Sequence, residues 1–104
     1  MEKQKIVDVL KTYGVNDKVK GFDILVELLY MLSNDIEKGI TNVKTYNIKN
    51  YYYKLSKQFD ISVKTVPSNI RNAVTLKNIY GNGLKPKEII EVVLNIVEKE
   101  RGVD

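Results

Sequence analysis

The stretch that decides the fold is Tyr53–Asn78, YKLSKQFDISVKTVPSNIRNAVTLKN. Its apolar residues recur at helical spacing on both sides of a turn: Leu55, Phe59, Ile61, Val66 and Ile70. Asp60 falls where the chain must turn, and Ser56 is small where two crossing helices must approach closely. This pattern predicts two short helices joined by a tight turn, a helix-turn-helix.

The second helix of this pair has two different faces when its residues are placed at 100° intervals. The apolar face consists of Val63, Val66, Ile70, Ala73, Val74 and the stem of Lys77. The opposite face consists of Lys64, Ser68, Arg71, Asn72 and Thr75. This polar face carries no acid, which suits a helix that hydrogen-bonds to base edges in a DNA groove. An ordinary amphipathic surface helix has a similar pattern, so the window alone leaves both interpretations open.

Pro67 breaks a local rule, because a proline inside a helix removes a backbone hydrogen bond and clashes with the preceding turn. The conflict disappears if Thr65 is the N-cap, since the first turn needs no intrahelical donor. The sequence therefore predicts an extended turn over residues 62–65. The helix then runs to about Ile79 and is ended by the glycines at Gly81 and Gly83.

The composition excludes most catalytic and metal-binding chemistry. The chain has 104 residues, with no cysteine and no histidine. Cysteine or serine nucleophiles paired with histidine and the usual zinc ligand sets are therefore impossible. We expect no enzyme activity, no cofactor, no metal and no small-molecule substrate. No apolar run approaches the ~20 residues that cross a bilayer, and no signal-peptide core begins the chain, so we expect a cytoplasmic protein without a membrane partner.

The positive charge is concentrated in the middle of the chain. The formal net charge is +4, but residues 38–87 hold ten basic side chains and one acidic one, while residues 1–37 and 88–104 are both net acidic. A strongly basic segment attracts a polyanion, and nucleic acid is the usual one. An anionic membrane surface competes less well, because no helix combines the lysines with large apolar side chains.

Helical spacing continues through the rest of the chain and predicts an all-α fold. We expect one compact helical domain over residues 1–104, with about five to six helices. The expected helices outside the motif cover residues 3–13, 22–37 and 86–97, the first motif helix covers 48–59, and residues 38–47 form a loop. The expected core contains Leu25, Leu28, Leu29, Leu32, Leu55, Phe59, Val66, Ile70, Val93 and Ile96. Among the three successive tyrosines Tyr51–Tyr53, we place Tyr52 in this core.

Several stretches resemble a known family. They are YGVNDKVKGF (Tyr13–Phe22), MLSNDIE (Met31–Glu37), KLSKQF (Lys54–Phe59), NIRNAV (Asn69–Val74) and KPKE (Lys85–Glu88). In this order the stretches are similar to the C-terminal DNA-binding (effector) domain of stage 0 sporulation protein A, a response regulator. The resemblance implies an all-helical domain that binds short promoter boxes, with the second motif helix in the major groove.

The sequence departs from this family at the expected reading helix. Pro67 and Ser68 replace a Glu and an Arg that take part in reading DNA, whereas Arg71 falls on a basic position and Asn72 replaces a neighbouring His. The connection over residues 38–50 is longer than the family's. The chain begins with the effector domain, so we expect no receiver domain and carry over no phosphorylation-triggered dimerisation.

Two functions remain as hypotheses. The first is a sequence-preferring transcription factor for double-stranded DNA, acting alone or as a homodimer on paired sites. Its expected base-reading residues are Arg71, Ser68, Asn72 and Thr75, and its expected phosphate contacts are Lys54, Lys57, Lys64 and Thr65. The second is a protein-interaction module that has kept the fold but lost base reading, and that associates with a related full-length regulator. The basic middle segment favours the first hypothesis, and Pro67 and Ser68 favour the second.

Overall fold

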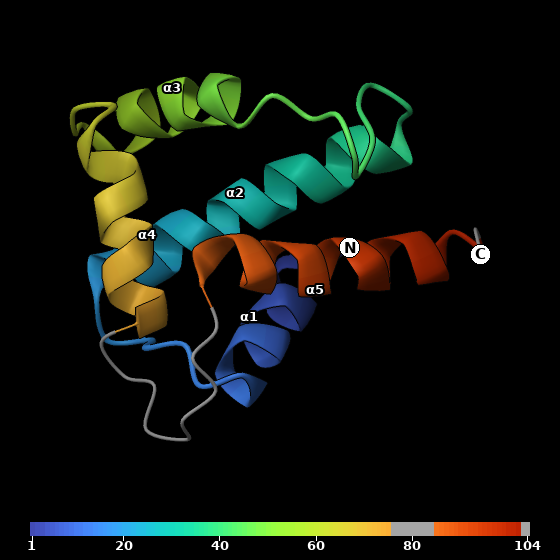
Figure 1. The fold of residues 1–104 in the computed structure, drawn as a ribbon, viewed down its shortest axis with the longest axis horizontal. Coiled ribbons are helices and arrows are strands. Elements are labelled where there is room, and N and C mark those ends of the chain that lie inside the picture. Colours follow the sequence, from blue (N-terminus) through green and yellow to red (C-terminus); the bar gives the residue numbers. More distant parts are fainter. Residues whose placement is uncertain (76–84, 103–104) are drawn as a thin grey trace.

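The computed structural model describes residues 1–75 and 85–102, except the side chain of Thr75, and these residues form five α-helices and no strand (Figure 1). The helices are α1 (Lys3–Thr12), α2 (Lys20–Glu37), α3 (Ile48–Phe59), α4 (Thr65–Thr75) and α5 (Pro86–Glu100). The prediction of an all-α fold is confirmed. The expected end of the fourth helix near Ile79, its glycine stop and Lys77 lie outside the described residues.

α2 is the central helix, and it packs against each of the other four. The leucines on one side of α2 are buried: Leu25, Leu28, Leu29 and Leu32. Phe22, Ile24 and Val26 beside them are also buried, so α2 is apolar around most of its circumference. The helix ends at Glu37, and Gly39 follows two residues later with a φ of 75°, the left-handed conformation that glycine adopts without strain. No described helix is long and apolar enough to cross a membrane.

The core contains most of the residues that helical spacing predicted. Those buried as expected are Leu25, Leu28, Leu29, Leu32, Leu55, Val66, Ile70 and Val93. Phe59 and Ile96 are only half-buried, so this part of the prediction is wrong. Phe59 is the last residue of α3 and lies at the rim of the core. On α5 the buried stripe includes Leu94, and Ile96 falls at its edge.

The tyrosine in the core is Tyr51, not Tyr52. The side chain of Tyr51 is 5% exposed, and its hydroxyl donates a hydrogen bond of 2.6 Å to Asp35 Oδ2 on α2. Burial raises the pKa of the Tyr51 phenol above its ordinary value, and the hydrogen bond and the negative charge of Asp35 add to this. Tyr52 is half-buried and Tyr53 is exposed. Leu55 is buried near both candidates, so spacing alone could not separate Tyr51 from Tyr52.

We expect Tyr51→Phe to lower the free energy of unfolding by about 1–2 kcal/mol, because it removes a hydrogen bond to a carboxylate and leaves the ring in place. Tyr53→Phe is the matched control, since that ring is 54% exposed. The raised pKa of Tyr51 also stabilises the fold below the unfolded value of about 10 and loses this contribution as the pH rises beyond it. Urea titrations of both variants at neutral and alkaline pH test this. Equal unfolding midpoints for the two variants would contradict the prediction.

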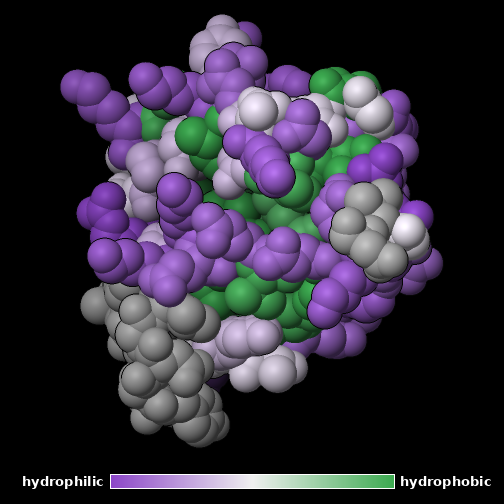
Figure 2. Space-filling model, turned by 45° about the vertical axis from the view of Figure 1, so that its right-hand side comes forward, coloured by the Kyte–Doolittle hydropathy of each residue, from purple (hydrophilic) through white to green (hydrophobic). Residues whose placement is uncertain are grey.

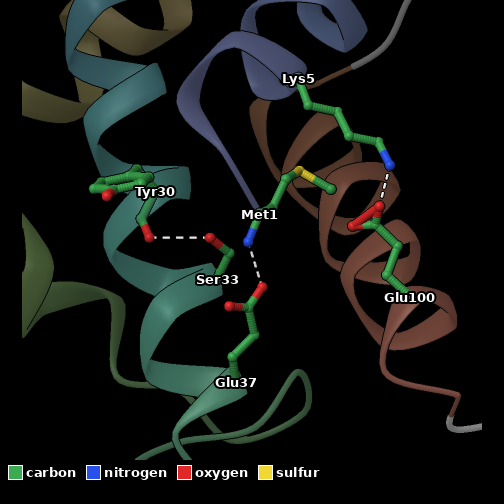
Figure 3. Close-up of polar contacts among 6 residues, drawn as sticks. All are labelled: Met1, Lys5, Tyr30, Ser33, Glu37 and Glu100. Carbon is green, nitrogen blue, oxygen red and sulfur yellow. Dashed lines mark hydrogen bonds and ion pairs between the residues drawn. The ribbon is translucent and has the colours of Figure 1, made fainter.

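Ion pairs join the N-terminal residue and α1 to the ends of α2 and α5 (Figure 3). The N-terminal amine of Met1 pairs with Glu37 at the end of α2, and Lys5 pairs with Glu100 at the end of α5. α5 stays helical through Glu100, beyond the predicted end near residue 97, and the Lys5 pair is made with its last residue.

Candidate nucleic-acid interface

A tight turn joins α3 to α4, which meet at a corner in Figure 1. Asp60 follows α3 in the left-handed conformation, with a φ of 53°. This conformation lets the Ile61 N–H reach back to the carbonyl of Ser56 at 3.0 Å. Ser56 is buried, as its small size beside α4 predicted. The sequence prediction of two helices around a turn at Asp60 is therefore confirmed.

Pro67 lies in the first turn of α4, as predicted, because the helix begins at Thr65. Thr65 is the first helical residue rather than a cap. Its hydroxyl donates a hydrogen bond of 2.8 Å to the Ser62 carbonyl, instead of accepting one from the helix. The Thr65 N–H donates to the same carbonyl at 3.0 Å. The predicted N-cap role of Thr65 is therefore wrong, although the physical reason for tolerating Pro67 stands.

The inner face of α4 lies directly on the start of α2. A Cβ atom built on Gly21 would be 1.8 Å from the carbonyl oxygen of Asn69, so no side chain other than hydrogen fits there. Gly21 is buried, and its helical backbone packs against the middle of α4. This contact fixes the depth at which α4 sits on α2. The expected helix over residues 22–37 left Gly21 outside it, although Gly21 stands inside one of the stretches that carry the family resemblance.

Two further hydrogen bonds hold α4. The Asn16 N–H, in the segment between α1 and α2, donates to the Ala73 carbonyl at 2.9 Å. The Asn69 side-chain amide donates to the Thr65 carbonyl at 2.8 Å. Sequence analysis assigned no role to Asn16 or Asn69, because neither an apolar period nor a capping pattern points to them.

The outer face of α4 carries the predicted polar residues. Arg71 and Asn72 are exposed, and Ser68 is half-buried with its hydroxyl donating to the Thr65 carbonyl at 3.0 Å. The predicted Thr75 side chain lies outside the described part of the chain. Val63 does not belong to the apolar face, because it precedes the helix in the turn and is 42% exposed. The structure thus brings Ser68, Arg71 and Asn72 onto one surface.

The lysines proposed for phosphate contact are exposed beside this surface. The Lys57 ammonium lies 4.6 Å from the ring centre of Tyr53, and that of Lys54 lies 5.4 Å from the ring centre of Tyr51. Lys64 is in the turn immediately before α4. Among residues 1–75 and 85–102, none of these three lysines has a carboxylate partner. Their positive charge is therefore not neutralised within the described structure.

Arg71 also influences the neighbouring helix. Burial raises the pKa of the Tyr52 phenol on α3, and the positive charge of Arg71 opposes this shift. The guanidinium is therefore close enough to Tyr52 for its field to be felt there. Between Ile48 and Thr75 the sequence holds the basic residues Lys49, Lys54, Lys57, Lys64 and Arg71, and Asp60 is the one acid.

Residues 6–102 match the family described as Sporulation initiation factor Spo0A C terminal. The chain belongs to this family. The Spo0A C-terminal domains are DNA-binding regulatory domains of sporulation and are not an enzyme family, so the predicted family and its function in transcription regulation are confirmed. Comparisons with curated proteins and with solved structures give no significant match.

Proposed function

We propose that this Spo0A C-terminal domain is a sequence-preferring regulator of transcription that inserts α4 into the major groove of double-stranded DNA. α3 and α4 then act as a helix-turn-helix, in which the second helix contacts base edges and the first lies across the backbone. In this arrangement Arg71, Ser68, Asn72 and Thr75 face the bases, and Lys54, Lys57, Lys64 and Thr65 face the phosphates.

The observation that supports this proposal most directly is that the lysines near α4 have no carboxylate partner among the described residues. The lysines of α1 make ion pairs with carboxylates, whereas Lys54, Lys57 and Lys64 make none with any residue that the structure describes. Unneutralised cations on α3 and in the turn that precedes an exposed, acid-free helix face are suited to binding the phosphates beside a groove. The Thr65 hydroxyl already donates within the turn, so we expect its phosphate contact to be weaker than those of the lysines.

The experiment that tests this function is a binding selection on randomised duplex DNA at low salt, followed by titration of the enriched duplex. We expect an enriched sequence and an affinity that falls steeply between about 50 and 200 mM salt, as counterion release requires. The same titration gives the number of chains per duplex and so distinguishes a monomer from a homodimer. Absence of both enrichment and salt dependence would instead favour the protein-interaction module.

We expect Arg71→Ala to remove the preference for one G·C pair. A guanidinium makes two parallel hydrogen bonds to guanine O6 and N7, a pairing that discriminates by about 1–3 kcal/mol. The shorter side chains of Ser68 and Asn72 discriminate less, so the remaining preference should be weak. Selection with the variant measures this directly, and helical content by circular dichroism should be unchanged. Retention of the parent preference would show that Arg71 does not read bases.

A further inference from the structure

A pocket of ≈ 580 Å³ lies on a different part of the surface, between α3, α5 and the loop that precedes α3. α3 and α5 are both fully described and do not pack on each other, although each packs on α2 and α4. Figure 2 shows hydrophobic surface within the hollow on this face, with hydrophilic side chains around it. The volume is in the range of sites for small organic ligands.

The pocket combines an apolar surface with hydrogen-bond donors. Ile48 and Ile90 contribute aliphatic surface from α3 and α5. Tyr46 and Tyr52 are half-buried in the wall, and burial is the main cause that raises the pKa of each phenol. Both phenols therefore stay protonated at neutral pH. Within the described residues, neither hydroxyl makes a hydrogen bond to the protein.

The charges at the pocket favour an anion. Lys44 and Lys87 line it from opposite sides, and neither has a carboxylate partner among the described residues. Glu91 is the one acid in the lining. At the two phenols the charges differ in sign, since the positive charge of Arg71 acts on Tyr52 and the negative charge of Glu91 acts on Tyr46. The first residues of α3 and α5 border the pocket, and the positive ends of the two helix dipoles add to the positive charge of the two lysines.

We propose that this pocket binds an organic anion with an apolar body, such as an aromatic carboxylate or sulfonate. Lys44 and Lys87 bind the anionic group, the phenols of Tyr46 and Tyr52 donate hydrogen bonds to it, and Ile48 and Ile90 contact the apolar body. The proposal goes beyond the sequence-based expectation of no cofactor and no small-molecule substrate, because it concerns a ligand that is bound and not converted. It does not depend on DNA binding, because the pocket forms within a single chain.

The test uses anilinonaphthalene sulfonate, which has an aromatic body and one negative charge, and N-phenylnaphthylamine as its uncharged counterpart. We expect saturable one-to-one binding of the sulfonate by the full chain in the absence of DNA, and binding of the amine that is weaker by about tenfold, since it lacks charge-assisted hydrogen bonds. In the amide NMR spectrum, the shifted signals should be those of residues 43–48, 52 and 87–91.

The double variant Lys44→Glu/Lys87→Glu should weaken sulfonate binding by about tenfold or more. Lys18→Glu/Lys99→Glu is its matched control, because it changes the net charge equally at exposed positions away from the pocket lining. Near-ultraviolet circular dichroism verifies that both variants keep their tertiary packing. An equal loss in the control, shifts located elsewhere, or binding that does not saturate would each overturn the proposal.

Discussion

Gly21→Ala is expected to lower the free energy of unfolding by about 3 kcal/mol, because it forces an added methyl group into a closely packed contact between two helices. The added methyl group would lie 1.8 Å from the Asn69 carbonyl oxygen, far inside van der Waals contact. The atom that it meets is backbone in the middle of α4, so no side-chain rotation relieves the overlap. α4 and α2 must move apart, which also opens the packing around Ile70 and Val74.

The sign of the change in unfolding free energy distinguishes a packing effect from an effect of helix propensity. Alanine is the better helix former, so at an unconstrained position Gly21→Ala would stabilise α2 by roughly 0.5–1 kcal/mol. Lys20→Ala is the control, because it is exposed at the neighbouring helical position and should change stability by less than about 0.5 kcal/mol. Urea unfolding measures both variants. A Gly21→Ala variant as stable as the parent would mean that α2 and α4 are not in this close contact.

The triple variant Lys54→Gln/Lys57→Gln/Lys64→Gln is expected to weaken duplex binding about a hundredfold or more at 0.1 M salt. Each lost phosphate contact lowers the slope of log K against log salt by about 0.9 and removes the release of its counterions. Three contacts should therefore lower the slope by nearly three, and each single substitution by about one. Because these lysines contact phosphates, all sequences should lose affinity alike.

A second triple variant provides the control for net charge. Lys18, Lys38 and Lys99 are exposed and lie outside α3 and α4, so Lys18→Gln/Lys38→Gln/Lys99→Gln removes the same total charge from other surfaces. Its salt slope should stay close to that of the parent. An equal decrease in the salt slope for both triple variants would show that binding depends on net charge alone. It would contradict the placement of α3 and the turn against the DNA backbone.

The sequence predicted the helices well, because their apolar periods are long and their ends carry strong local signals. Asp60 at the turn, Gly39 after α2 and Pro86 at the start of α5 each have a backbone preference that acts regardless of tertiary context. Tyr51 was assigned wrongly because two adjacent tyrosines lie equally near the edge of an apolar stripe, and only the position of Asp35 on another helix decides between them.

The contacts that hold α4 in position could not be predicted from the sequence. The packing of Gly21 on Asn69 and the hydrogen bond from Asn16 to Ala73 join residues about 50 positions apart, and no local pattern encodes such a pairing. The outer face of α4 was easier, since helical periodicity alone collects Ser68, Arg71 and Asn72. The pocket was missed because its wall combines a loop with two helices that are distant in the sequence.

The loop over residues 38–47 lies between two points that α2 itself fixes. At one end, Gly39 terminates α2, and at the other the hydroxyl of Tyr51 anchors α3 to Asp35. The closing entropy of such a segment grows only slowly with its length, by about 0.6 kcal/mol for each doubling. A change in the length of this loop therefore adds little closing entropy. The orientation of α4 is set by its packing on α2, not by the number of residues in the loop.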